Sequence, residues 1–207
     1  MRLVLLGPVG SGKGTQAKLI SERYGVPHIS TGEIFRWNIQ NETELGKQAK
    51  KFVDAGELVP EELTIKIVED RLASEECQKN GFILDGFPRN LVQAKALEKM
   101  ATIDKALLID LSEEEIIRRL SSRRMCRECG HSTSLDWLVD GKCDKCGGEV
   151  YVRNDDKPEV IKNRLKKQAV PQDVVEFYKN KNVFSSINAT DEIEKTYKLV
   201  DEVLKTI

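Results

Sequence analysis

The sequence has no long uninterrupted apolar run. A membrane-spanning helix needs about 20 predominantly apolar residues, and no such stretch occurs in the 207 residues. The apolar start at residues 3–6 ends at Gly7 and Pro8, which makes it too short for the apolar part of a signal peptide. We therefore expect a cytoplasmic protein that does not associate with membranes.

The chain also lacks a charge excess of either sign. Its 33 Lys and Arg residues nearly balance 34 Asp and Glu residues, for a formal net charge of -1. This balance, with only 6% aromatic residues, argues against a general nucleic-acid binder, which needs a basic surface and aromatic platforms. The overall composition is that of one ordinary globular domain with room for small inserts.

Cysteine is scarce, but four of the five cysteines are arranged in pairs. They form two C-x-x-C motifs: Cys126, Cys129, Cys143 and Cys146. This spacing indicates a metal site rather than disulfides. Cys77 stands alone in a helical pattern, and we assign it no function.

Five short apolar runs recur along the chain, and most precede a segment of helical period. They lie at residues 3–6, 28–30, 82–84, 106–111 and 183–187. Alternating strands and helices predict a doubly wound α/β fold with a five-stranded parallel sheet. In such a fold, ligands bind at the carboxyl ends of the strands.

Two stretches interrupt this alternation. Residues 30–59 read as two short helices joined near residues 41–45, whereas residues 122–156 are rich in Cys, Gly and charge. Both are expected to be inserts above the binding edge of the sheet. The predicted core domain comprises residues 1–29, 60–121 and 157–207.

A glycine-rich segment follows the first predicted strand. Residues 7–15 read GPVGSGKGT and lead into a helical pattern that runs to about residue 24. Glycines allow the backbone N–H groups to converge on one anion at the helix N-terminus, and Lys13 adds a positive charge. The segment fits the P-loop pattern G-x-x-x-x-G-K, so a polyphosphate is the expected ligand. A glycine-rich turn without a ligand is the alternative.

Four segments together resemble the adenylate kinase family of nucleoside monophosphate kinases. They are GPVGSGKGTQA at 7–17, STGEIFR at 30–36, DGFPR at 85–89, and Gln93 at the expected offset. The resemblance extends over nearly the whole chain and implies reversible, magnesium-dependent transfer of the ATP γ-phosphoryl group to AMP, giving two ADP. It also implies a monomer that maintains adenine nucleotide balance. Val9 and Asn90 depart from the family, which usually has Pro and Thr there; this concerns loop rigidity rather than the reaction.

The resemblance assigns the phosphate-binding side chains. Arg36 and Arg89 are expected to hold the AMP phosphate, while Arg119 packs against the ATP base. The groups expected to act in catalysis are Lys13, Arg89, Arg123, Arg153, Arg164, Asp155 and Asp156. Planar guanidinium groups suit this work because they grip phosphate oxygens in pairs. We expect Arg118, Arg124 and Arg127 to be surface charges.

Three aspartates have separate expectations. Asp85 follows a predicted strand, which would place its carboxylate beside the phosphate loop, where it can hold a water of the nucleotide-bound magnesium. Asp155 and Asp156 precede Pro158. In the family, the matching aspartates assist closure of a lid, but simple capping of the next helix is an equal alternative.

The resemblance also assigns two nucleotide pockets. The ATP-binding residues are Gly10, Ser11, Gly12, Lys13, Gly14, Thr15, Arg119, Arg123, Ser132, Thr133 and Asp191. The AMP-binding residues are Thr31, Arg36, Glu57, Leu58, Val59, Gly86, Phe87, Arg89, Gln93, Arg153 and Arg164. The amide of Gln93 can both donate to and accept from an adenine edge. His28 and His131 are expected to be structural or solvated, because this reaction needs no imidazole base.

The paired cysteines predict a structural zinc site in a lid formed by residues 122–156. Four thiolates close the coordination of zinc and leave no position for water, which excludes catalysis by this metal. Free thiols or an iron centre are the alternatives. A lid of this size has little apolar core of its own, so a metal ion can stabilise it.

Three rival functions use some of the same features. A kinase for UMP, CMP or several monophosphates would share the phosphate loop and the lid. A zinc-ribbon ATPase would use the basic stretch at 118–127 to bind nucleic acid. A nucleotide sensor without transfer activity would not need the full set of arginines.

Overall fold

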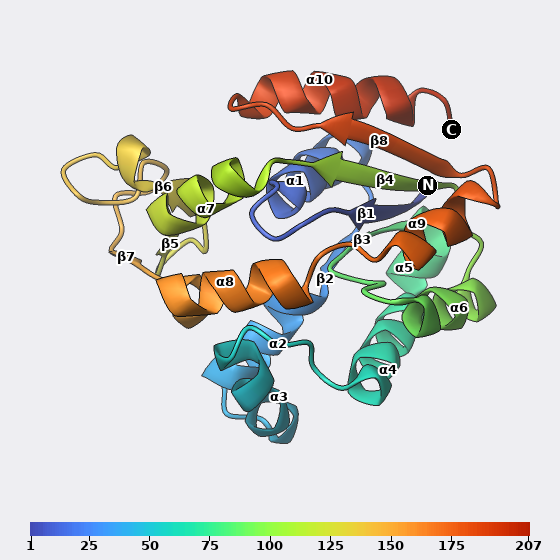
Figure 1. The fold of residues 1–207 in the computed structure, drawn as a ribbon, viewed down its shortest axis with the longest axis horizontal. Helices are drawn as coiled ribbons and strands as arrows, with labels where there is room; N and C mark the ends of the chain where they lie inside the picture. Colours follow the sequence, from blue (N-terminus) through green and yellow to red (C-terminus); the bar gives the residue numbers. More distant parts are fainter.

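The computed structural model describes all 207 residues and contains a five-stranded parallel sheet. Its strands are β1 (Arg2–Leu6), β2 (His28–Ser30), β3 (Phe82–Asp85), β4 (Lys105–Asp110) and β8 (Phe184–Asn188). They lie in the order β2-β3-β1-β4-β8 (Figure 1). The five predicted strands are confirmed. β1 is the switch point of this order, because the chain passes from it first to one side of the sheet and later to the other.

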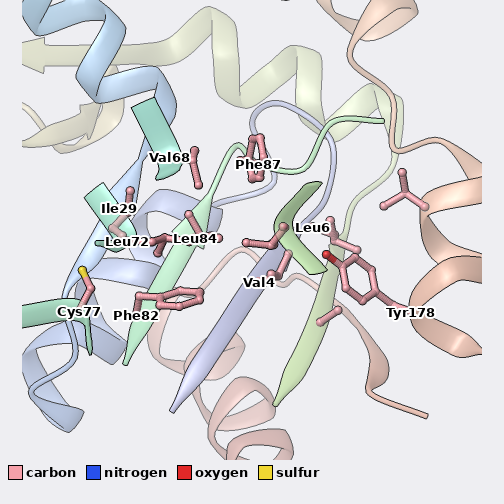
Figure 2. Close-up of a cluster of buried hydrophobic side chains, with 13 residues drawn as sticks. Val4, Leu6, Ile29, Val68, Leu72, Cys77, Phe82, Leu84, Phe87 and Tyr178 are labelled. Atoms are coloured by element: carbon pink, nitrogen blue, oxygen red, sulfur yellow. The ribbon is translucent and has the colours of Figure 1, made fainter. Parts of the chain in front are cut away.

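Alternating side chains of the strands build two cores, one on each face of the sheet. Leu3 and Leu5 of β1 face α1 (Lys13–Tyr24) and α10 (Ile193–Leu204). Val4 and Leu6 face the opposite layer, formed by α4 (Glu61–Leu72), α5 (Glu75–Asn80), α6 (Leu91–Met100) and α9 (Gln172–Lys179). Figure 2 shows this second core, with Phe82 and Tyr178 among its largest members. Burial on both faces explains why the strands are continuous apolar runs.

Polar caps fix where several helices begin. The side chains of Ser74, Asn90 and Ser112 each accept a hydrogen bond from a backbone N–H in the first turn of the helix that follows. Such caps satisfy N–H groups that have no partner within the helix. Asn90, which differs from the residue usual in the family, therefore has a structural role at the start of α6.

The insert at residues 30–59, which the resemblance predicts to bind the nucleoside monophosphate and which is named the NMP-binding insert for that expectation, contains the two predicted helices, α2 (Thr31–Gln40) and α3 (Glu44–Asp54). They pack closely at Gly46, where an added Cβ would lie 2.1 Å from the Asn38 carbonyl oxygen. Phe35, Ala49 and Val59 form the small core of this insert. Figure 1 shows the two helices below the carboxyl edge of the sheet and beside α8 (Pro158–Lys167).

The lid, residues 122–156, is attached between α7 (Glu113–Ser122) and α8. It contains a three-stranded antiparallel sheet in the order β6-β5-β7, formed by Ser132–Ser134, Arg123–Cys126 and Val150–Tyr151. Two short 3₁₀ helices, Leu135–Trp137 and Asn154–Asp156, complete it. The low helical content agrees with the sequence, although the sequence did not indicate the sheet. No helix of the protein has the length and apolarity needed to cross a membrane.

Candidate functional site

The phosphate loop, residues 7–15, joins β1 to α1 and directs the start of α1 toward the binding edge. Gly7, Gly10 and Gly12 have positive φ angles of 147°, 78° and 91°, which side chains disfavour. A Cβ on Gly7 would also lie 2.3 Å from the Ile109 carbonyl oxygen. No side chain caps α1, so its first N–H groups can bind an anion.

Lys13 is a buried cation at the start of α1, with 7% of its surface exposed. Its Nζ donates hydrogen bonds to the Pro8 carbonyl oxygen at 2.6 Å and to Ser11 Oγ at 3.5 Å. Burial is the main cause that lowers the pKa of Lys13 to about 7, against the opposing effect of Asp85. A bound polyphosphate would supply the negative charge that this lysine lacks.

Asp85 lies at the carboxyl end of β3, close to the start of α1. A Cβ on Gly14 would lie 3.4 Å from Asp85 Oδ2, and His28 Nε2 is 3.8 Å from the same oxygen. Burial alone would raise the pKa of Asp85, but His28 and Lys13 outweigh it and hold the pKa at about 2. The carboxylate is therefore ionised and placed beside the phosphate loop, as the sequence predicted.

His28 is nearer to the site than the sequence suggested. It begins β2, where Ser30 is in register with Asp85 of β3. Its Nε2 is buried and makes no hydrogen bond, and the 3.8 Å approach to Asp85 is too long for one. The strand pairing, which local sequence patterns do not specify, is what brings His28 to the site.

One side of the site is formed by the ends of β2 and β3. Thr31 Oγ1 and Arg89 Nε each donate to the Gly86 carbonyl oxygen at 3.0 Å. Gln93 Oε1 accepts a 2.7 Å hydrogen bond from the Arg89 backbone N–H. The structure thus brings these four residues of the predicted AMP pocket together. Phe87, a fifth predicted member, has no exposed surface and packs in the core (Figure 2), so the structure does not place its side chain in the pocket.

The other predicted AMP-binding residues lie in and beside the NMP-binding insert. Arg36 lies against Gly32, where an added Cβ would be 3.0 Å from Arg36 Nη1. Val59 packs in the small core of the insert, and Leu58 beside it is half-buried. Glu57 pairs with Lys167 of α8 at 2.7 Å. The insert therefore contacts α8, the helix that follows the lid in the chain.

Two buried carboxylates hold the arginines at the lid junction. Arg123 donates to the Asp156 carboxylate through Nε, at 2.8 Å, and through Nη2. Arg164 Nη1 donates to Asp156 Oδ1 at 3.0 Å and lies 3.2 Å from Asp155 Oδ2. Lys157 occupies the N-cap position of α8, and no side chain caps this helix. The alternative that Asp155 and Asp156 are helix caps is therefore wrong.

Arg153 completes this group of cations. Its Nε is buried and has no hydrogen-bond partner. Burial and the nearby charges of Arg36 and Arg123 lower the pKa of Arg153 to about 9. Several guanidinium groups with an unused buried donor indicate a site for an anion with several oxygens, such as a phosphoryl group.

A pocket of about 700 Å³ lies between the loop that joins β4 to α7 and the loop that joins β8 to α10. It is lined by β4–α7 and β8–α10 residues: Asp110, Leu111, Ser112, Glu115, Arg119, Asn188, Ala189, Thr190 and Asp191. Arg119 reaches toward the phosphate loop, since a Cβ on Gly12 would lie 3.9 Å from Arg119 Nη1. The predicted ATP-binding residues Arg119 and Asp191 thus share one pocket. Ser132 and Thr133 instead lie on β6 of the lid, with no hydrogen bond to the phosphate loop.

The four paired cysteines form one cluster in the lid. Their Sγ atoms all lie within 4.8 Å of one another, with pairs at 3.3, 3.4 and 3.8 Å. Zinc bound tetrahedrally at about 2.3 Å needs sulfurs about 3.8 Å apart. The Cys143 N–H donates to the Gly148 carbonyl oxygen, and the Gly147 N–H donates to that of Cys143, which folds the second pair into a tight turn. The donor set and spacing fit zinc.

The phosphate loop, the adjacent carboxylate and the converging arginines define an enzyme of the P-loop class that transfers phosphoryl groups. Comparison with known proteins specifies the family. The model of the family described as adenylate kinase matches residues 5–183. An adenylate kinase of Clostridium tetani is 50% identical over the full length of both chains. Those of Caldicellulosiruptor saccharolyticus and Methanothrix thermoacetophila are each 49% identical, over 100% and 99% of this chain and 99% and 98% of their own. The chain belongs to the adenylate kinase family and is a phosphotransferase.

Proposed function

We propose that this site transfers the γ-phosphoryl group of ATP reversibly to AMP, giving two ADP, and so maintains adenine nucleotide balance. One observation carries the proposal: Arg123 and Arg164 share the Asp156 carboxylate at the lid junction, and Lys13 and Arg153 both lie within the electrostatic reach of Arg123. The electrostatic effects of Arg123 and Arg164 on Lys13, and of Arg123 on Arg153, reflect this proximity. Phosphoryl transfer depends on such charge stabilisation more than on a covalent nucleophile.

The donor phosphates are proposed to bind at the phosphate loop. Gly10, Ser11, Gly12, Gly14 and Thr15 flank the start of α1, which no side chain caps, and their N–H groups are proposed to bind the phosphates while Lys13 adds the charge. Because these groups are already in place, little reorganisation is needed when the charge moves during transfer.

The arginines are proposed to divide between acceptor and transferred group. Arg36 and Arg89 hold the AMP phosphate, whereas Arg123, Arg153 and Arg164 surround the phosphoryl group in transit. Asp155 and Asp156 keep Arg123 and Arg164 oriented in the absence of nucleotide. The carboxylates also assist closure of the lid, because both belong to the segment that joins the lid to α8.

Adenine selectivity at the acceptor site is proposed to depend on Thr31, Gly86 and Gln93, with Glu57, Leu58 and Val59 from the NMP-binding insert. Gln93 is almost completely buried, with 1% exposed. Its Oε1 is used by Arg89, and its Nε2 donates to no protein atom, which leaves a donor for a ring nitrogen of the base. In the donor pocket, Arg119 and Asp191 are proposed to contact the ATP base, and Ser132 and Thr133 are proposed to reach ATP from the lid.

Two metal ions have separate proposed roles. Asp85 would hold magnesium through a water molecule, and the ion would neutralise charge on the nucleotide phosphates. Cys126, Cys129, Cys143 and Cys146 would hold zinc as a structural ion that supports the lid. The domain boundaries given above, the cytoplasmic location and the monomeric state stay predictions from the sequence.

A single incubation tests the proposed reaction. The protein is supplied with ADP and Mg²⁺ alone, and the nucleotides are separated by chromatography. Equal amounts of ATP and AMP are expected, and their absence would refute the proposal. The forward reaction with ATP over a panel of AMP, UMP, CMP and GMP then tests the acceptor, where a preference for UMP or CMP would reassign the substrate.

A further inference from the structure

Glu115 lies in the donor-base pocket, and its carboxylate holds the Arg119 side chain. Arg119 Nε donates to Glu115 Oε1 at 2.8 Å, across one turn of α7. Both side chains are largely buried, with 23% and 21% exposed. Partial burial strengthens such a pair, because water screens the charges less than at an open surface.

A second contact fixes Arg119 from the opposite wall of the pocket. Arg119 Nη2 donates to the Thr190 carbonyl oxygen at 2.9 Å, in the loop between β8 and α10. Glu115 and Thr190 thus engage the guanidinium at two of its nitrogens. All donors of a guanidinium lie in its plane, so these contacts use its edge and leave its flat face for stacking on an aromatic ring.

From this arrangement we infer that Glu115 is a positioning residue for the donor nucleotide: it holds Arg119 so that the guanidinium presents its face to the base of ATP. The inference rests on the proposed function, in which Arg119 packs against that base. A free arginine side chain loses rotational entropy when it stacks on a ligand. The bond to Glu115 removes most of this freedom before ATP arrives.

Arg118 also pairs with Glu115, but Arg118 does not line the pocket. Its Nε donates to Glu115 at 2.7 Å, and its side chain is 56% exposed and pairs with the exposed carboxylate of Asp191. Removing Arg118 leaves the bond between Glu115 and Arg119 in place. Arg118→Ala is therefore a matched control, and Glu114→Ala controls for loss of an acidic residue in the first turn of α7.

The test compares ATP with inorganic triphosphate, which has phosphates but no base. Dissociation constants are measured by calorimetry with Mg²⁺ present. Glu115→Ala is expected to weaken ATP binding about 2- to 10-fold, the range for one side chain that must be immobilised on binding. Binding of triphosphate and the KM for AMP stay unchanged, as do all constants in the two controls. Glu115→Gln keeps an acceptor for Arg119 and restores most of the ATP affinity.

A second comparison shows whether Glu115 acts through Arg119. Arg119→Ala is expected to weaken ATP binding, and adding Glu115→Ala to it gives no further loss. If Glu115→Ala weakens ATP and triphosphate equally, or adds its full effect to Arg119→Ala, the inference is wrong although Arg119 keeps its role. If Arg119→Ala itself leaves ATP binding unchanged, the proposed contact with the base fails as well, while ADP disproportionation still reports on the overall reaction.

Discussion

The two sheets of this protein differ in what keeps them folded. The parallel sheet is covered by helices on both faces, and residues such as Leu3 and Val4 have no exposed surface. The lid sheet has only short strands, and Leu135, Trp137 and Val139 around it are exposed. The lid instead gathers four cysteine Sγ atoms within 4.8 Å of one another. The core is therefore stabilised by apolar burial, whereas the lid depends on the metal proposed for its cysteines.

The charges that we propose to act in catalysis lie where these two units meet. Arg123 begins the lid, Arg164 belongs to α8, and the Asp156 carboxylate between them has no exposed surface. Lys13 belongs to the core and is buried beside its sheet. If the comparison is correct, perturbing the core site should change chemistry, whereas perturbing the metal site should change the folding of the lid.

Removing the metal is expected to have the largest effect. Zinc binding supplies about 10 kcal/mol or more to the folding of small zinc domains, so a Cys129→Ser variant treated with chelator should unfold the lid while the core stays folded. Hydrogen exchange checks this: amides at 123–151 lose protection, and those of β1, β3 and β4 keep it.

Activity should decline only as the lid unfolds, with a lowered thermal midpoint. Cys77→Ser is the control, since Cys77 lies in the core cluster and that variant should still bind one zinc per chain. Immediate loss of activity with full protection of the lid would contradict a structural role for the metal.

Replacing Lys13 should have the next largest effect, on the reaction. Lys13→Met removes the cation nearest to the phosphate loop, and kcat should fall at least about 10³-fold, as expected for loss of a charge that stabilises the transition state. Steady-state kinetics measure it. Lys18→Met is the control on the same helix, because Lys18 pairs with Glu33 at the surface. A loss smaller than tenfold would remove Lys13 from the proposed mechanism.

Replacing Asp156 should affect stability. Asp156→Ala leaves Arg123 and Arg164 without their shared carboxylate, and loss of one partner of a buried ion pair costs about 3–5 kcal/mol. Urea denaturation measures the free energy of unfolding. Asp136→Ala, at an exposed position of the lid, should change it by less than about 0.5 kcal/mol. A similar small change for Asp156→Ala would show that water compensates the two arginines.

The smallest expected effect is a pH dependence of stability. The pKa of Lys13 is about 7 in the folded protein and 10.5 ordinarily. Between pH 7 and pH 10.5 the unfolded chain binds more protons than the folded protein, so the free energy of unfolding rises with pH. Below pH 7 Lys13 is protonated in both the folded and the unfolded protein, so the folded protein bears the full free-energy cost of burying the cation.

The measurement compares the nucleotide-free protein with Lys13→Met at pH 7 and pH 9. The difference in the free energy of unfolding between the two proteins should change by about 2 kcal/mol from pH 7 to pH 9, in favour of the unsubstituted protein at pH 9. Saturating ATP should remove this dependence, because the phosphates stabilise the charged lysine. A difference that is independent of pH would contradict the lowered pKa.

The sequence predicted those features that depend on local pattern. The five strands, the two helices of the insert and the phosphate loop all follow from apolar period, glycine and lysine. It left open whether Asp155 and Asp156 are helix caps, because a carboxylate before Pro158 is compatible with both roles. Only the packing of α8 against the lid brings Arg164 to Asp156. The positions of His28 beside Asp85 and of Glu115 beside Arg119 were likewise not predicted, since strand register and side-chain pairing leave no local signal.

The helix α8 links the two inserts. Its Asn163 and Gln168 side chains donate to the carbonyl oxygens of Ala55 and Gly56, and Lys167 pairs with Glu57. An added Cβ on Gly56 would lie 2.7 Å from Arg164, so the turn that ends the NMP-binding insert packs on the helix that carries Arg164, an arginine proposed to bind the transferred phosphoryl group. The lid and the insert are thus linked through α8. Because α8 directly follows the lid and bonds to the end of the insert, a displacement of α8 together with the lid would have to break these three contacts.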